Sequence, residues 1–124
     1  MFSLNSSLSY YLYSLPTDAR KSFDGLCNLV QTGLNRNPMS GEAFVFINRR
    51  RDRMKLLRWE PGGFILYYKR LESGTFELPK KDFTGNTCQV YWPELVMMVE
   101  GISLQHIRTR KRFEPAGKLT TECS

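Results

Sequence analysis

One turn signal constrains the fold of this 124-residue chain more than any other feature. Pro61-Gly62-Gly63 separates two runs of apolar and basic residues, 54–60 and 64–70. Proline fixes φ at the second position of a tight turn, and glycine allows a positive φ at the third. The sequence therefore predicts a β-hairpin in which Glu60 faces Gly63. This register pairs Trp59 with Phe64, Arg58 with Ile65, Leu57 with Leu66, Leu56 with Tyr67, Lys55 with Tyr68 and Arg53 with Arg70.

Both faces of the predicted hairpin carry apolar side chains. We therefore expect the first helix to cover one face, and the C-terminal elements or a partner to cover the other. A register shifted by one residue is the alternative, and it would exchange the two faces.

The remaining patterns predict an α+β fold with a small antiparallel sheet, the hairpin at its centre, a longer N-terminal helix and a short C-terminal helix. Apolar residues recur at helical spacing from Ala19 to Leu34, and Thr17 or Asp18 can cap that helix. The other expected elements are a strand over 10–14 that pairs at a sheet edge, strands over 43–47 and 88–91, and a helix from Pro93 to Gly101.

Length and composition indicate one packed domain. The chain is 41% hydrophobic and 24% charged, which is typical of globular proteins. We expect a single domain over 1–107 and a basic, then polar, flexible tail over 108–124. The N-terminal stretch does not resemble a signal peptide, and no apolar run is long enough for a membrane span. The expected location is therefore the cytoplasm, with no membrane partner.

The soft metal ligands are few and scattered. Cys27, Cys88 and Cys123 have no paired spacing, and His106 is the one histidine. This pattern argues against a zinc or iron site and against cysteine–histidine catalysis. We expect no metal and no cofactor, with Cys27 and Cys88 acting as small buried hydrophobic residues.

Positive charge is concentrated in the segment from Arg49 to Arg70, which contains the predicted hairpin. The formal net charge is +6, and residues 49–70 hold eight basic residues against two acidic ones. The eight basic residues are Arg49, Arg50, Arg51, Arg53, Lys55, Arg58, Lys69 and Arg70. A second cluster near the C-terminus holds Arg108, Arg110, Lys111 and Arg112. Because cationic side chains on neighbouring strands can replace the counterions of DNA phosphates, both clusters are candidate DNA-binding residues.

Two alternatives accompany this interpretation. The alternative for the strip is a solubilising face or a contact for an acidic protein partner. Arg20 and Lys21, at the predicted helix N-terminus, oppose the helix dipole and are candidates for partner contact, or are ordinary exposed side chains. Trp59, Tyr67 and Tyr68 lie among the charges, where packing in the sheet is favoured over stacking on bases.

The sequence does not predict an enzyme. Asp18 and Asp24 lie six residues apart on the expected helix, and therefore on different faces. Asp52 lies among arginines, which favours an ionised partner over a proton donor. The chain also lacks the glycine-rich phosphate loops of nucleotide-binding proteins.

Several motifs in order resemble one family. The strings are Pro16-Thr17-Asp18-Ala19-Arg20-Lys21-Ser22-Phe23-Asp24-Gly25-Leu26, Pro38-Met39-Ser40-Gly41, Phe44-Val45-Phe46, Arg49-Arg50-Arg51-Asp52-Arg53-Met54-Lys55-Leu56-Leu57-Arg58-Trp59 and Tyr68-Lys69-Arg70-Leu71-Glu72-Ser73-Gly74-Thr75-Phe76. From about Tyr10 to Gly101 the chain resembles the TnpB-type accessory proteins of the IS-sixty-six family of bacterial insertion sequences. These are distinct from the RNA-guided nuclease that shares the TnpB name.

The resemblance implies a process rather than a site. The family is encoded beside a separate transposase and is needed for transposition, and it has no established catalytic residues. It implies a non-catalytic accessory protein with two partners, DNA of the transposon or target and the transposase of the same element. The alternative is a protein adaptor that contacts the transposase or a second copy of itself without binding DNA.

Overall fold

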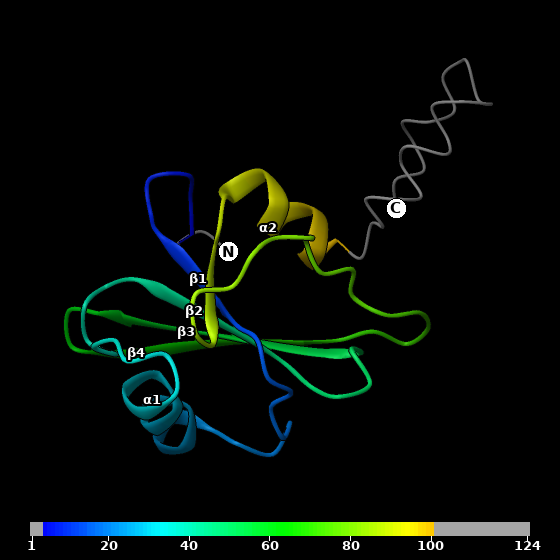
Figure 1. Cartoon of the computed structure of the whole chain (residues 1–124). Helices are drawn as coiled ribbons and strands as arrows, with labels where there is room; N and C mark the ends of the chain where they lie inside the picture. Colours follow the sequence, from blue (N-terminus) through cyan, green and yellow to red (C-terminus); the bar gives the residue numbers. More distant parts are fainter. Residues whose placement is uncertain (1–3, 101–124) are drawn as a thin grey trace.

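The computed structural model describes residues 4–100, and these form one mixed five-stranded sheet with a helix on each face (Figure 1). The strand order is β4-β3-β2-β1-β5. The elements are β1 (Tyr10–Tyr13), α1 (Phe23–Thr32), β2 (Ala43–Ile47), β3 (Arg53–Glu60), β4 (Gly63–Arg70), β5 (Thr87–Val90) and α2 (Trp92–Val99). The α+β class is confirmed, whereas the expectation of an antiparallel sheet is wrong because β1 and β2 pair in parallel.

The strands β3 and β4 pair in the expected register, from Glu60 opposite Gly63 to Arg53 opposite Arg70. Gly62 has φ of +100°, as a glycine at the third position of the turn permits. Each strand has eight residues, and the register that the turn sets continues without a bulge to the other end of the hairpin. The hairpin forms one edge of the sheet, with β4 outermost, and the expectation that it lies at the centre is wrong.

The N-terminal strand β1 lies inside the sheet, and the expectation of an edge position is also wrong. It pairs in parallel with β2 and antiparallel with β5. Tyr10 and Leu12 are buried on the α2 side of the sheet, and Tyr13 is buried on the α1 side. Because α2 covers one face of this short strand and α1 covers the other, its apolar side chains are buried on both sides at an interior position. The helix α1 is the crossover that parallel pairing of β1 and β2 requires.

The first helix starts at Phe23 rather than at Ala19, with Ser22 as its N-cap residue. Asp18 does not cap it. Its carboxylate accepts the backbone N–H of Arg20 at 2.9 Å, and its carbonyl accepts the N–H of Lys21 at 3.0 Å. These bonds close a separate turn before the helix, since an aspartate side chain readily bonds to the backbone two residues later. Arg20 and Lys21 therefore lie in a connecting segment and not at the helix N-terminus.

Two apolar layers fill the space between the sheet and the helices. On one face, Leu26 and Val30 of α1 pack with Phe44 and Phe46 of β2. On the other, Leu95 and Met98 of α2 pack against β1, β2 and β3. The hairpin is partly covered on both faces, as expected in direction: Phe64 and Leu66 pack against the α1-side core and Tyr67 against the α2-side core, but no residue of β4 is fully buried. This arrangement leaves the loops at the ends of the strands exposed.

The C-terminal elements deviate little from expectation. The last strand begins at Thr87, one residue before the predicted start, and α2 has proline in its first turn. Cys88 is buried as expected, while Cys27 is only half-buried. Cys123, Gly101 and the predicted tail lie outside the described residues, so the domain boundary at 107 stays a prediction.

Candidate nucleic-acid interface

The eight basic residues of 49–70 do not share one surface. Side chains alternate between the two faces of a strand, so neighbours in sequence face opposite ways. Arg53, Lys55 and Arg70 belong to the face that α1 covers, and Arg58 and Lys69 to the face that α2 covers. Arg49, Arg50 and Arg51 lie in the turn between β2 and β3. The continuous strip expected from the sequence is therefore divided.

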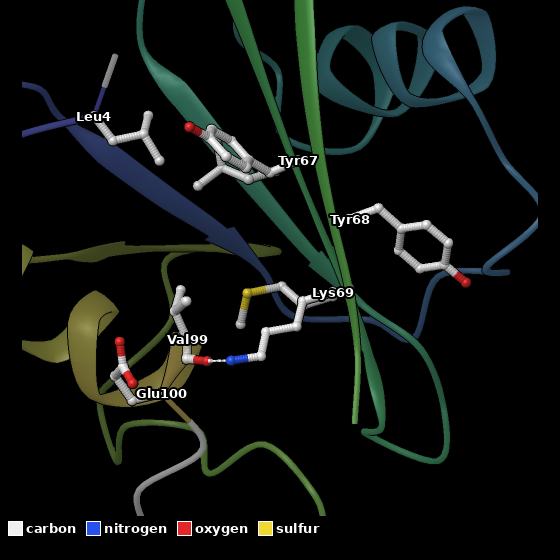
Figure 2. A pocket seen from close by; sticks show the side chains of 8 residues that line it. Leu4, Tyr67, Tyr68, Lys69, Val99 and Glu100 are labelled. Carbon is white, nitrogen blue, oxygen red and sulfur yellow. Dashed lines mark hydrogen bonds between the residues drawn. The ribbon is translucent and has the colours of Figure 1, made fainter. Parts of the chain in front are cut away.

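The two basic residues on the α2 face are engaged within the protein. The guanidinium of Arg58 donates to the carbonyl of Gly41 at 3.2 Å and pairs with Glu60. The ammonium of Lys69 donates to the carbonyl of Val99 in the last turn of α2 (Figure 2). A cation at the C-terminal end of a helix is also stabilising, because that end of the helix dipole is negative. These two side chains have structural roles.

Lys55 is engaged on the opposite face and draws a distant segment to the sheet. Its Nζ donates to the carbonyls of Ala19 and Lys21, both at 2.7 Å, and lies 4.7 Å from the centre of the Tyr68 ring. The backbone N–H of Thr17 donates to the carbonyl of Ile47 at 2.9 Å. These contacts hold the segment that contains Arg20 and Lys21 beside the end of β2.

The turn after β2 is held in shape by Asn48. Its Oδ1 accepts the backbone N–H groups of Asp52 and Arg53 at 3.0 and 2.9 Å, and its Nδ2 donates to the Asp52 carboxylate at 2.8 Å. The Asn48 carbonyl accepts the N–H of Arg51 at 3.0 Å. Arg51 has φ of +62°, in the left-handed region that non-glycine residues seldom occupy. The turn therefore presents its arginines from a fixed backbone.

Together these elements form a cationic corner, which comprises Arg20, Lys21, Arg49, Arg50, Arg51, Arg53 and Arg70. Among the described residues, the side chains of Arg49, Arg50 and Arg51 form no ion pair or hydrogen bond, and all three are exposed. The other three arginines are paired with nearby carboxylates: Arg20 with Asp18 at 2.8 Å, Arg53 with Asp52 at 3.3 Å and Arg70 with Glu72 at 3.1 Å.

The acidic groups at the corner are charge partners. Hydrogen bonds from Arg20 hold the pKa of Asp18 far below its usual range. The amide of Asn48, with a smaller contribution from Arg53, lowers the pKa of Asp52. Both carboxylates are therefore ionised at neutral pH and are poor proton donors.

An open hollow of about 530 Å³ lies within the corner, and we call it the corner hollow. Its lining residues come from two segments: Pro16, Thr17, Asp18 and Ala19 on one side, and Asn48, Arg49, Arg50 and Arg53 on the other. Thr17 is buried, and its hydroxyl has no hydrogen-bond partner among the residues that the structure describes. Thr17 was one of two residues, with Asp18, predicted to cap the helix, and Asn48 had no predicted role, although an asparagine before three arginines and an aspartate is a recognisable turn signal.

A second hollow of about 360 Å³ is mainly apolar (Figure 2). Its lining residues are Leu4, Met54, Leu56, Tyr67, Tyr68, Lys69, Val99 and Glu100. Figure 2 shows Tyr67 on the side of Leu4, whereas the ring of Tyr68 points away from the hollow. This apolar hollow lies on the α2 face, opposite the face of Lys55 and Arg53.

The aromatic residues of the hairpin mostly serve packing. Trp59 meets Phe64 edge to face, with 4.9 Å between ring centres. Tyr67 packs against the α2-side core, and only Tyr68 is largely exposed, at 53%. Packing in the sheet was favoured over stacking on bases for these rings, and Trp59 and Tyr67 do pack against neighbouring side chains.

Three further predictions concern ligands and location. Arg108, Arg110, Lys111 and Arg112 lie outside the described residues, so their role stays a prediction. Within 4–100, no three histidine, cysteine, aspartate or glutamate residues gather as a metal site. No helix in the described part of the chain is both long and apolar enough to cross a membrane.

The described residues thus define a small α+β protein with an arginine-rich corner, and comparison with known proteins identifies its family. Residues 8–109 match the family described as IS66 Orf2 like protein, and the chain belongs to this family. The match extends beyond Gly101, where the resemblance seen in the sequence ended, and it includes Arg108. Membership indicates a transposition-associated accessory role.

Two curated relatives from one organism are similar to this chain, and both are described as uncharacterized. The uncharacterized protein y4hO of Sinorhizobium fredii is 34% identical over 91 residues, which cover 73% of this chain and 76% of y4hO. The uncharacterized protein y4jC of the same organism is 42% identical over 64 residues, or 52% of this chain and 55% of y4jC. The chain thus matches about half the length of y4jC. No solved structure matches the chain.

Proposed function

We propose that this chain is a non-catalytic accessory protein of DNA transposition that binds transposon or target DNA through the cationic corner. In this role it assists the transposase of the same element in the cytoplasm. One observation carries the proposal: the side chains of Arg49, Arg50 and Arg51 are exposed on a fixed turn without a partner among residues 4–100. Such side chains are available for an external anion.

The physical basis is the displacement of counterions by arginine. Each phosphate that a cation neutralises releases condensed ions, and affinity then falls steeply with salt. Guanidinium groups bind phosphate oxygens in a two-pronged geometry that ammonium groups lack. Because Asn48 already holds the turn, little backbone entropy is lost on binding. A corner with these properties favours DNA over a neutral partner.

The test is to neutralise the turn in the full chain, with Arg49→Gln, Arg50→Gln and Arg51→Gln combined. Fluorescence anisotropy with a labelled DNA duplex, titrated at several salt concentrations, measures affinity and its salt dependence. We expect affinity to fall about 10- to 100-fold at low salt, and the log–log salt slope to decrease by about three, because three phosphate contacts are lost.

A matched control removes the same net charge at the far edge of the sheet. Lys80→Gln, Asn86→Asp and Gln89→Glu change exposed residues in β5 and the connection before it. We expect this variant to retain the salt slope and nearly all of the affinity. If the two triple variants lose affinity equally, overall charge explains binding and the corner does not.

A protein adaptor is the second candidate, and the apolar hollow favours it. This hollow exposes an apolar surface on the α2 face, where a segment of the transposase or of a second copy can bury it. Under this alternative, the arginines contact protein or keep the chain soluble, and DNA is not contacted directly.

Co-purification with the transposase after nuclease treatment separates the two candidates. An adaptor keeps the transposase after nuclease and loses it in Val99→Gln, which places an amide in the apolar hollow. A DNA-bridged association disappears with nuclease and is insensitive to Val99→Gln. The triple variant Arg49→Gln, Arg50→Gln, Arg51→Gln weakens a DNA-bridged association, and it weakens a nuclease-resistant association only where the arginines contact the transposase itself.

A further inference from the structure

The corner hollow has the chemistry of an anion site as well as a concave shape. Arg49 and Arg50 line one side of it, and neither side chain is paired within 4–100. Its volume of about 530 Å³ falls within the range of roughly 300–1,000 Å³ usual for ligand pockets. Exposed arginines on a convex turn attract any polyanion, whereas a concave site can hold one group in a defined position.

The hydroxyl of Thr17 is the second, independent observation. Thr17 is only 6% exposed, and its Oγ1 has no hydrogen-bond partner among the described residues. Its backbone N–H is bonded to Ile47, which fixes the residue beside β2. A smaller, water-sized space of about 10 Å³ also lies against Thr17 and shares Asp18 and Arg53 with the corner hollow. A buried hydroxyl is unfavourable without a bond, so a ligand oxygen or a bridging water is its natural partner.

The acidic wall of the hollow does not oppose an anion. Asp18 faces Arg20, which donates from its backbone N–H, Nε and Nη2. Asp52 is held by Asn48 and Arg53. Both carboxylates are thus hydrogen-bonded by their own partners, while the side chains of Arg49 and Arg50 form no hydrogen bond or ion pair within residues 4–100.

We propose that the corner hollow binds one phosphate group of the DNA backbone, with Arg49 and Arg50 on its oxygens and the Thr17 hydroxyl donating directly or through one water. This inference rests on the proposed function and specifies how the strand is positioned. A phosphate contact fixes the register of a protein on nucleic acid without reading its sequence. The hollow would therefore set where the strand lies, and the convex Arg51 would add general attraction.

The test compares Thr17→Val with Thr17→Ser in the full chain. Valine has the shape of threonine without the hydroxyl, and serine keeps the hydroxyl. Inorganic phosphate is titrated while the backbone amide NMR signals of residues 17–19 and 48–50 are followed. We expect saturable shifts in the parent and in Thr17→Ser, and about tenfold weaker binding in Thr17→Val, because a hydrogen bond to a charged group is lost. A short DNA duplex should compete with phosphate for these signals.

Three outcomes overturn the proposal. If Thr17→Val raises the melting temperature and leaves phosphate and duplex binding unchanged, Thr17 is a packing residue only. If phosphate binds but the duplex does not compete, the hollow takes free phosphate and not the DNA backbone. If no shift saturates, the hollow binds no phosphate. In each case the salt-slope experiment with the arginine turn still decides whether the corner binds DNA.

Discussion

At the scale of single residues, the backbone of Arg51 is the feature most open to test. An L-residue at φ of +62° is strained by roughly 1–2 kcal/mol, and glycine is not. Arg51→Gly should therefore raise the free energy of unfolding by up to about 1 kcal/mol in urea denaturation. The same change should weaken DNA binding and reduce the salt slope by about one, because one cation is lost.

Asn35 provides the matched control for Arg51, since its φ is +61° and it carries no charge. Asn35→Gly should give a similar or smaller gain in stability without changing the salt slope. A stability gain in both variants with unchanged DNA binding in both would contradict a role of Arg51 in the interface.

Gly33, directly after α1, is a second residue-scale test. A Cβ at this position would lie 2.8 Å from the carbonyl oxygen of Leu29 and 2.9 Å from the ring of Tyr13. Because neither group can move freely, Gly33→Ala should destabilise the fold by about 1–3 kcal/mol, measured by thermal or urea unfolding.

Gly25, inside α1, is the comparison for Gly33. A Cβ there meets only the flexible side chain of Lys21, at 3.3 Å. Gly25→Ala should leave stability unchanged or raise it by about 0.5–1 kcal/mol, because alanine is the better helix former. If both variants lose the same stability, steric crowding of the Cβ at position 33 does not explain the loss.

At the scale of elements, the connection from α1 to β2 is tied by one ion pair. Arg36 donates to the Glu42 carboxylate from Nε and Nη2, at 3.1 and 2.9 Å, and lies 3.9 Å from the centre of the Tyr11 ring. Hydrogen bonding to Arg36, with a smaller contribution from Ser40, lowers the pKa of Glu42 below its ordinary value. The ion pair thus makes the free energy of unfolding depend on whether Glu42 is ionised.

The pH dependence of this contribution has a defined sign. Because the folded-state pKa of Glu42 is depressed, the stabilisation is complete above its unfolded value near 4.3 and is lost as pH falls through the folded value. Since both side chains are partly exposed, we expect about 0.5 kcal/mol. Urea unfolding of the parent and Glu42→Gln should differ at pH 7, and the difference should shrink as pH falls below the unfolded value of Glu42; a constant difference would point to packing instead.

The elements that depend on local chemistry could be predicted from the sequence, and those that depend on distant partners could not. The hairpin register followed from Pro61 and Gly62, and the strand over 43–47 from its apolar run. The start of α1 was missed because the Asp18 turn competes with the helix for the same residues. The interior position of β1 depends on β5, more than seventy residues later.

At the scale of the whole molecule, the candidate site could be predicted only in part. The sequence located the arginines of the turn, yet simple alternation along β3 already places Arg53 and Arg58 on opposite faces. The proximity of Arg20 to the turn could not be predicted, because it results from Lys55 and Ile47 binding a segment thirty or more residues away.

The position of β1 also determines how the molecule comes apart. Three residues of this strand pair with β2 and four pair with β5. The first and the last strand of the sequence therefore lie side by side in the sheet. If β5 detaches, β1 becomes an open edge with weak support, and the two should fray as a unit while the long β3–β4 ladder persists. Their amide hydrogens should then exchange with solvent at a shared rate, faster than those of β3.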